Sequence, residues 1–294
     1  MATDDNRIAL SVVIAVWPDS SGLLQCLESL ASGQRDSTEV LVVAPDPPSS
    51  EILDRFPWIH WLQGSSEMLV PHLWSAGINQ SHGQIVALST SRFVPASDWL
   101  EKMREAHRRL ASVGIGGAIE PGPEGNMQSW AIYFLRYSAY LNYTREQIVD
   151  DIAGENASYK RDSLSSHRAA FANGFWEPEV HRLLRADGDT LSFVPEIRVT
   201  QGAPLGIGCF CRQRFRHGRH FGRERVQKSS VLVHFARILT SPLVPIVLLA
   251  RICARVITSR RYFRQLVFCL PLLVVFTLAW AIGELAGYCS IRSK

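Results

Sequence analysis

Short apolar runs alternate with helix-like stretches over the first part of the chain. The runs at residues 10–16 and 40–43 are continuous and rich in β-branched residues, as is typical of strands buried on both faces of a parallel sheet. The stretches at 22–30 and 99–110 have helical periodicity and polar residues in front that can cap a helix. This alternation predicts βαβ units and an α/β fold with a mainly parallel sheet and flanking helices.

The middle of the chain, from about residue 114 to 228, is less regular. A strand is predicted at 191–195, and aromatic residues gather between 130 and 143. Their helical spacing favours one buried helix face over a sugar-binding platform. We therefore predict a single α/β domain over residues 1–228.

Apolar content rises after residue 230. Residues 266–283 carry no charge and nearly reach the length that spans a bilayer, which predicts a transmembrane helix at about 265–288. Residues 231–257 are also apolar, but arginines and prolines interrupt them. An interfacial or re-entrant helix is favoured there. Residues 229–294 are thus predicted to form a membrane-associated helical region.

The net charge of +4 is modest, but basic residues crowd one short segment. The segment contains Arg212, Arg214, Arg216, Arg219, Arg223, Arg225 and Lys228. Such a segment favours phosphates, on a nucleotide or on lipid headgroups. No zinc-finger, RRM-type or helix-turn-helix pattern accompanies it, so nucleic acid is not a predicted partner. The 6 cysteines are scattered without paired spacing and are expected to be reduced thiols.

The order of these elements, with Gly83-Gln84-Ile85 before the third apolar run and Asp98-Trp99 after it, resembles the family 2 glycosyltransferases. Those enzymes have a GT-A fold. The resemblance implies a nucleotide-sugar donor site to which Val16, Asp46, Ser89 and Ser91 contribute. Ser89 and Ser91 occupy the positions of the family's Asp-x-Asp pair, which holds a divalent cation against the donor diphosphate.

Gln201 stands where family members often carry a metal-ligand histidine. Serine and glutamine are poor ligands for Mg²⁺ or Mn²⁺, so we predict no metal cofactor. Arginine side chains must then neutralise the leaving diphosphate. Arg214 and Arg216 are the candidates, and Gln213 joins them in the donor site, because residues 213–217 resemble the Gln-x-x-Arg-Trp element of processive members, with histidine for tryptophan. An alternative role for these arginines is contact with anionic lipid.

Two glutamates are candidates for the catalytic base. Trp176 and Glu177 align with a Glu-Asp pair whose second member is the family's proposed base, and Glu179 follows where a further acid often stands. A carboxylate beside an aromatic side chain can gain basicity through desolvation. Asn156, in a segment that resembles the family's Gly-x-Asn turn, and Trp176 are assigned to the acceptor side.

The leading prediction is an inverting glycosyltransferase that moves a sugar from a nucleotide-diphosphate donor to a lipid, lipid-linked or saccharide acceptor at the membrane. Basic residues before the predicted span place the domain in the cytoplasm. The alternatives are a non-catalytic membrane partner or regulator with the same fold, and an adaptor that binds lipid phosphates through the basic segment.

Overall fold

The computed structural model describes residues 8–33, 35–123, 125–202, 204–227 and 230–290, so Lys228 of the basic segment lies outside it. The chain forms two compact units. The first, here the sheet unit, comprises Met1–Gly122 and Tyr143–Ala203, and the second, the helical unit, comprises Pro123–Asn142 and Pro204–Lys294. The domain boundary proposed at residue 228 stays a prediction.

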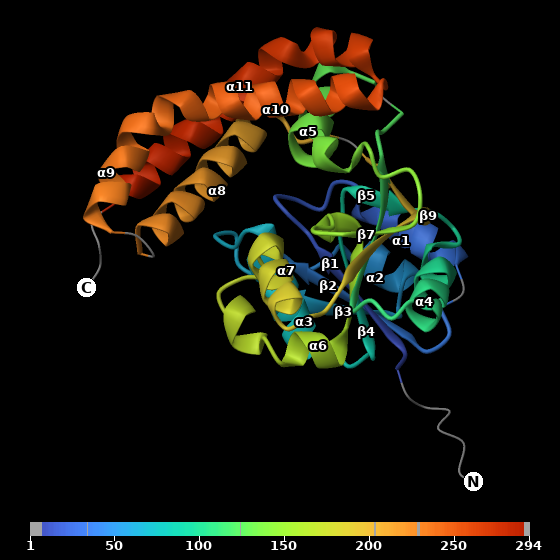
Figure 1. Cartoon of the computed structure of the whole chain (residues 1–294). Coiled ribbons are helices and arrows are strands. Elements are labelled where there is room, and N and C mark those ends of the chain that lie inside the picture. Colours follow the sequence, from blue (N-terminus) through green and yellow to red (C-terminus); the bar gives the residue numbers. More distant parts are fainter. Residues whose placement is uncertain (1–7, 34, 124, 203, 228–229, 291–294) are drawn as a thin grey trace. The chain divides into compact units, whose positions relative to one another are not determined.

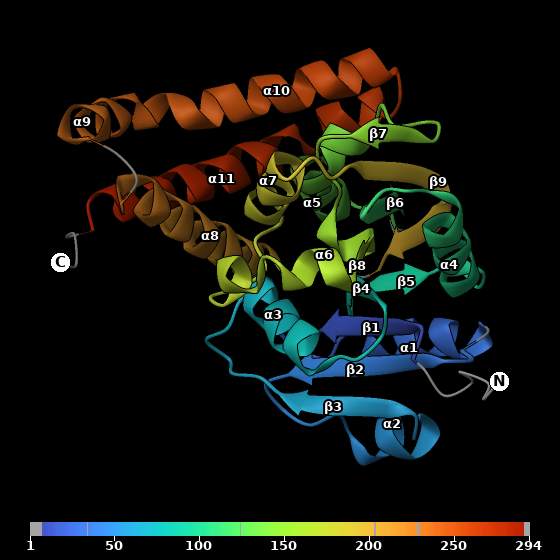
Figure 2. The ribbon, with the colours of Figure 1, turned by 60° about the horizontal axis from the view of Figure 1, so that its bottom comes forward.

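The sheet unit contains a 9-stranded sheet. Its strands are β1 (Leu10–Ala15), β2 (Thr38–Ala44), β3 (Ile59–Gln63), β4 (Ile85–Thr90), β5 (Phe93–Pro95), β6 (Gly114–Glu120), β7 (Gln147–Val149), β8 (Ala157–Lys160) and β9 (Leu191–Gln201). Their order is β3-β2-β1-β4-β8-β6-β9-β5, with β7 beside β9. Figure 2 shows β1, β2 and β3 side by side.

The strands β3, β2, β1 and β4 are parallel, as predicted, and every residue of β1 is buried. The other half of the sheet is mixed. β8 is antiparallel to both β4 and β6, and β9 is parallel to β6 but antiparallel to β5 and β7. Parallel neighbours are joined by a long crossover connection, usually a helix. Between β6 and β8 the chain instead leaves the sheet unit after Gly122 and returns to it at Tyr143. Strands β1, β2, β4, β6 and β9 nevertheless end at one edge, here the carboxyl edge.

Helices flank this sheet. They are α1 (Leu23–Ser32), α2 (Ser50–Arg55), α3 (Val70–Gln80), α4 (Trp99–Arg109), α6 (Arg161–Ser165) and α7 (Glu177–Ala186), with 3-10 turns η2 (Gly154–Asn156) and η3 (Arg168–Phe171). The predictions of α1 and α4 are confirmed. Helix α3 packs on β1 and β2 at Gly77, where a Cβ would lie 2.2 Å from Val13 Cγ1.

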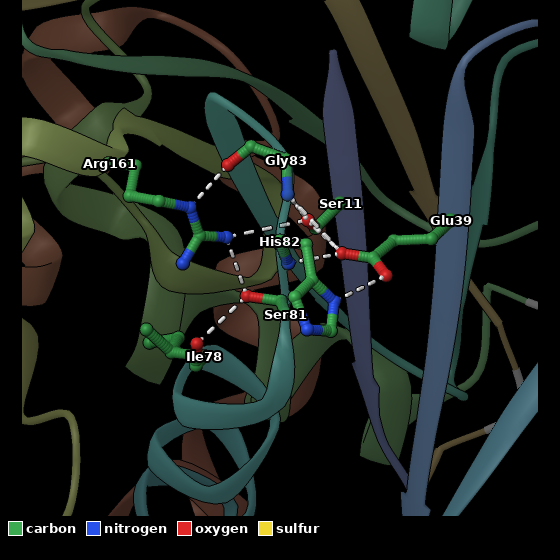
Figure 3. Close-up of polar contacts among 7 residues, drawn as sticks. All are labelled: Ser11, Glu39, Ile78, Ser81, His82, Gly83 and Arg161. Atoms are coloured by element: carbon green, nitrogen blue, oxygen red, sulfur yellow. Dashed lines mark hydrogen bonds and ion pairs between the residues drawn. The ribbon is translucent and has the colours of Figure 1, made fainter. Parts of the chain in front are cut away.

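A buried polar network joins the amino ends of β1, β2 and β4 (Figure 3). Glu39 accepts a hydrogen bond from Ser11 Oγ at 2.6 Å and another from the backbone N–H of His82. The N–H of Gly83 donates to Ser11 Oγ at 2.7 Å, and Arg161 donates to the carbonyl of Gly83. These contacts satisfy backbone groups that the sheet leaves unpaired at this edge.

The helical unit contains α5 (Met127–Tyr137), η1 (Ser138–Tyr140), α8 (Ile207–Gln227), α9 (Val231–Thr240), η4 (Ser241–Leu243), α10 (Val244–Ser259) and α11 (Phe263–Tyr288). Helices α8 and α11 run side by side (Figure 1). Their backbones approach closely at glycines, since a Cβ on Gly218 would lie 2.3 Å from the carbonyl oxygen of Trp280. All the aromatic side chains of α5 are buried, which agrees with a packed helix face.

Among the residues that the structure describes, two helical stretches have the length and apolar composition that a membrane span needs: 28 residues from Leu232 to Ser259, and 26 from Phe263 to Tyr288. The first combines α9, η4 and α10, so the prolines that interrupt the sequence pattern do not end the helical path. Both stretches expose large apolar side chains, including Leu232, Leu239 and Ile282. Whether either crosses a bilayer remains a prediction.

Candidate functional site

The carboxyl edge of the sheet holds four of the seven predicted donor-site residues. Val16 and Asp46 follow β1 and β2, and Ser89 and Ser91 lie at the end of β4. Val16, Ser89 and Ser91 are buried, whereas Asp46 is exposed. In open α/β sheets ligands bind at this edge. The sheet therefore brings these residues to a single edge, and their role in donor binding stays a prediction.

Glu177 lies in contact with the same edge through two neighbours. It begins α7, with Pro178 in the first turn, where proline suits a helix start. A Cβ at Gly154 would lie 2.5 Å from Glu177 Oε1 and 2.7 Å from Trp74 Cη2. The indole N–H of Trp74 donates to the carbonyl of Ser89 at 2.7 Å. Glu177 is partly exposed, and both its carboxylate and the Trp74 ring lie close to the Gly154 turn.

A buried histidine fixes α7 on the sheet. His181, one turn after Glu177, is 1% exposed and shares a hydrogen bond of 2.7 Å between its Nε2 and the hydroxyl of Tyr159 on β8. Its Nδ1 contacts the carboxylate of Asp151. Both ring nitrogens are therefore occupied, so the direction of α7, and with it the position of Glu177, is set by a side chain from β8.

Asn156 lies beside this turn but its side chain is used within the protein. It is fully buried, accepts a hydrogen bond from Trp99 Nε1 at 2.8 Å, and donates to the carbonyls of Ala118 and Ile197. The Asn156 side chain therefore positions η2, and its assignment to the acceptor side stays a prediction. Its neighbour Glu155 is 2% exposed, with its carbonyl accepting from Ser89 Oγ at 3.2 Å.

Trp176 and Glu179 flank Glu177 and are both partly exposed. The Trp176 ring packs edge-on against His72 at a centroid distance of 5.9 Å. Gly174 has a φ of 114° and lies close to Trp176 Nε1, so the turn before α7 needs glycine. The acceptor-side role of Trp176 and the alternative base role of Glu179 stay predictions.

An arginine directly follows the two serines of β4. Arg92 Nη2 donates to Asp19 Oδ1 at 2.8 Å, and the Arg92 side chain is 12% exposed while that of Asp19 is 55% exposed. Burial alone would raise the pKa of Asp19, but hydrogen bonds from Ser21 and the charge of Arg92 outweigh it and hold this pKa below its usual value. The N–H of Gly202 donates to the carbonyl of Arg92 at 2.7 Å.

Gln201 pairs with Phe93 across the β5–β9 ladder, so it too lies at the carboxyl edge. The three positions at which the family resemblance places metal ligands therefore hold Ser89, Ser91 and Gln201, and all three are neutral and buried. No group of three or more His, Cys, Asp or Glu in the described part of the chain is arranged to hold a metal ion. Neutral hydroxyl and amide side chains without any carboxylate do not fit a divalent cation.

The Gln213 to Arg216 element lies on α8 in the helical unit. Gln213 is 2% and Arg214 is 7% exposed, and Arg214 lies over the rings of Phe210 and Trp280. Arg214 also donates to Gln213 Oε1 at 3.3 Å. Arg216 is more exposed than either. The sequence motif does not distinguish the three residues. In the structure, Gln213 and Arg214 are buried within the helical unit, and Arg216 is partly exposed.

Two solved structures have a fold similar to that of this chain. A mannosyltransferase of Pyrobaculum calidifontis, PcManGT, in complex with GDP-Man and Mn²⁺, superimposes with a TM-score of 0.56, at 16% identity over 95% of this chain and 87% of that one. GalNAc-T7 with UDP, GalNAc and Mn²⁺ superimposes with a TM-score of 0.50, at 16% identity over 69% of this chain and 44% of that chain. The fold is of the GT-A glycosyltransferase type. No family model and no curated protein matches the sequence itself.

Two residues of this GT-A edge were missed at the level of sequence. Glu155 lies between two residues that the resemblance already singles out, and its burial shows only in the fold. Arg92 follows Ser91 directly, so the sequence itself showed a cationic side chain next to the serines that stand at the positions of the Asp-x-Asp pair. Its pairing with Asp19, 73 positions away, was not.

Proposed function

We propose that this protein is an inverting glycosyltransferase, attached to a membrane by its C-terminal helices with the sheet unit in the cytoplasm. It transfers a sugar from a nucleotide-diphosphate donor to a lipid, lipid-linked or saccharide acceptor. The GT-A fold supports the class, and both solved relatives are glycosyltransferases in complex with a nucleotide-sugar or a nucleotide and sugar. The donor lies at the carboxyl edge, near Val16, Asp46, Ser89 and Ser91.

The observation that supports catalysis is the placement of Glu177. Its carboxylate lies close to the Gly154 turn, which also lies close to the Trp74 ring, and Trp74 donates a hydrogen bond to Ser89 at the end of β4. In this proposal Glu177 takes the proton of the acceptor hydroxyl as that oxygen attacks the anomeric carbon. The bond from the anomeric carbon to the diphosphate oxygen breaks on the opposite side, and the nucleoside diphosphate leaves with both electrons. Trp176 then lies on the acceptor side, and Glu179 is the alternative base.

The charge on the leaving diphosphate is met by cationic side chains rather than by a metal. Arg216, with Gln213 and Arg214 nearby on α8, is one source, and the burial of Gln213 and Arg214 leaves Arg216 as the most accessible of the three. Arginine suits this role because its planar fork binds phosphate oxygens in pairs.

A screen of the purified full-length protein against nucleotide-sugars, with GDP-mannose and UDP-GalNAc among them, tests the proposal. Binding and hydrolysis are measured with EDTA and with Mn²⁺. The active donor is then used to compare Glu177→Gln with Glu179→Gln. We expect Glu177→Gln to bind donor normally and to transfer about 10²–10⁴ times more slowly. Normal transfer by Glu177→Gln would contradict the mechanism, and loss in Glu179→Gln alone would move the base two residues along the chain.

The second candidate function is that of a non-catalytic membrane partner of other transferases. The neutral, buried side chains of Ser89, Ser91 and Gln201 favour it, because the relatives with known ligands contain Mn²⁺. Failure of the wild-type protein to bind any nucleotide-sugar, with or without Mn²⁺, would support this candidate over the enzyme.

A further inference from the structure

The end of β4 combines two features that need a common explanation. The first is a pair of buried polar atoms, Ser91 Oγ and Gln201 Oε1, for which no hydrogen-bond partner exists among the described residues. Ser91 is fully buried and Gln201 is 5% exposed. Buried polar atoms normally find partners, and leaving one without any lowers the stability of the fold. Such atoms at the carboxyl edge point to a polar ligand that completes them.

The second feature is the mostly buried guanidinium of Arg92. It directly follows Ser91, and the N–H of Gly202, the residue after Gln201, donates to its carbonyl. A backbone hydrogen bond therefore joins residues 91 and 92 to residue 202, and these three residues are here called the Arg92 segment. A buried cation is costly unless a partner of opposite charge lies close, and here the partner is Asp19.

The loop that carries Asp19 is packed directly on the Arg92 segment. Gly22 has a φ of 80°, and a Cβ there would lie 2.6 Å from the carbonyl oxygen of Ser91. Asp19 Oδ1 also accepts a hydrogen bond from the N–H of Ser21 at 2.9 Å. The carboxylate is thus held by its own loop and reaches solvent, while Arg92 extends from the sheet to meet it. In the Arg92–Asp19 ion pair, the Asp19 carboxylate is therefore the part that faces solvent, while the Arg92 guanidinium is mostly buried.

We propose that Arg92 binds the diphosphate of the nucleotide donor at the place where metal-dependent relatives hold a divalent cation. This inference rests on the proposed function. The Ser91 hydroxyl can donate to a phosphate oxygen, whereas Gln201 Oε1 can only accept and so suits a hydroxyl or N–H of the same donor molecule. Asp19 neutralises Arg92 while no donor is bound, and the more strongly charged diphosphate displaces it. Replacement of the metal-binding acids by serines then has a physical reason, since two aspartates next to Arg92 would pair with the guanidinium and compete with phosphate.

Calorimetric titration of the full-length protein with GDP and with UDP, in EDTA, tests this role. The variants are Arg92→Ala and Arg92→Lys, with Arg109→Ala as the matched control, because Arg109 forms an exposed pair with Glu146 on the same unit. Wild type and Arg109→Ala should bind one of the two nucleotides equally well. Arg92→Ala should bind it about 10- to 100-fold more weakly, and Arg92→Lys should recover part of the loss because lysine keeps the charge but not the fork.

The specificity of the effect separates a phosphate contact from damage to the fold. Affinity for the matching monophosphate, GMP or UMP, should fall less in Arg92→Ala than affinity for the diphosphate. Thermal unfolding of each variant is measured alongside. An equal loss for mono- and diphosphate together with a lowered melting temperature in both Arg92 variants would overturn the proposal in favour of a structural role.

The remaining outcomes distinguish this inference from the function on which it rests. Undiminished diphosphate binding by Arg92→Ala overturns the inference and leaves the glycosyltransferase proposal intact. Binding by wild type that disappears with EDTA and returns with Mn²⁺ also overturns it, since a metal then supplies the charge. Absence of any nucleotide binding by wild type, with or without Mn²⁺, removes both.

Discussion

Replacement of Glu39 by glutamine tests whether the polar network at the amino edge stabilises the sheet unit. Glu39 is 8% exposed, and it accepts hydrogen bonds from Ser11 Oγ at 2.6 Å and from the N–H of Gly83 at 3.3 Å, besides that from His82. Hydrogen bonds to a charged group contribute about 1.5–3 kcal/mol each. An amide oxygen still accepts these bonds but has no charge. We therefore expect Glu39→Gln to lower the free energy of unfolding by about 1–2 kcal/mol.

Thermal unfolding of the detergent-solubilised protein, followed by tryptophan fluorescence, measures this loss. In a unit of this size 1 kcal/mol shifts the melting temperature by about 2–4 °C, so a decrease of about 2–8 °C is expected. Glu28→Gln is the control, because the Glu28–Arg55 ion pair has side chains 42% and 51% exposed. An exposed pair of this kind contributes about 1 kcal/mol at most. Equal melting temperatures for Glu39→Gln and Glu28→Gln at pH 7 would refute the reasoning.

The pH dependence gives a second, independent check on Glu39. Burial alone would raise the pKa of Glu39, but the hydrogen bonds from Ser11 and His82 outweigh it, so this pKa lies below its usual value of 4.5. A carboxyl whose pKa is lower in the folded state stabilises the fold above the unfolded pKa and loses that effect as pH falls through the folded pKa. The difference in melting temperature between wild type and Glu39→Gln should thus persist from pH 7 to about pH 5 and shrink below pH 4.5.

Two further substitutions in the sheet unit have defined outcomes. Burial lowers the pKa of His107 to about 4 from 6.5, so the unfolded chain takes up a proton in that window that the folded chain does not. Stability should fall as pH decreases from 6.5 to 4, and His107→Gln should remove this part of the slope in melting curves recorded across the window. Gly77→Ala should lower the free energy of unfolding by about 1–3 kcal/mol, because the new Cβ meets Val13; unchanged urea midpoints would show that α3 can shift.

The sequence predicted the parallel half of the sheet because its strands are buried on both faces. Continuous apolar runs at β1 and β2 leave no other use for those residues, and α1 and α4 follow from helical periodicity. Strand β9 was predicted only to Pro195, yet it continues to Gln201. Its ladder with β6 shifts register between Gly117 and Ala118, which accommodates the proline. Such a bulge depends on the partner strand and does not appear in local sequence.

Long-range contacts limited the prediction of the site in the same way. Motif spacing located Glu177 and the serines of β4, since each follows a recognisable strand or turn. It did not show that Trp74 links Ser89 to the Gly154 turn, or that Asn156 is occupied by Trp99. Nor did the basic segment show which arginines face the interior of their unit. Those facts depend on which surfaces of two elements meet, and one sequence does not contain that information directly.

The C-terminal helix α11 illustrates how a neighbour changes an interpretation based on hydropathy. Its run of uncharged residues predicts a transmembrane span, but α8 packs along its second half, with Phe210 against Phe276 at 4.6 Å. Glu284 on α11 is 2% exposed and accepts hydrogen bonds from Trp280 and from Arg225 of α8. On α8, which packs against α11, the side chains of Arg212, Arg219 and Arg223 are exposed.

Charged side chains are costly in the hydrocarbon core of a bilayer. If α11 crossed the membrane along its whole length, it would bring the exposed arginines of α8 into that core. We therefore expect α11 to lie in the membrane interface with α8 on its aqueous side. Cys289, at the end of α11, is exposed and provides the assay. In sealed vesicles of known orientation, an impermeant maleimide should label Cys289 and a cysteine introduced at exposed Arg261, just before α11, from the same side; labelling from opposite sides would show that α11 crosses the bilayer.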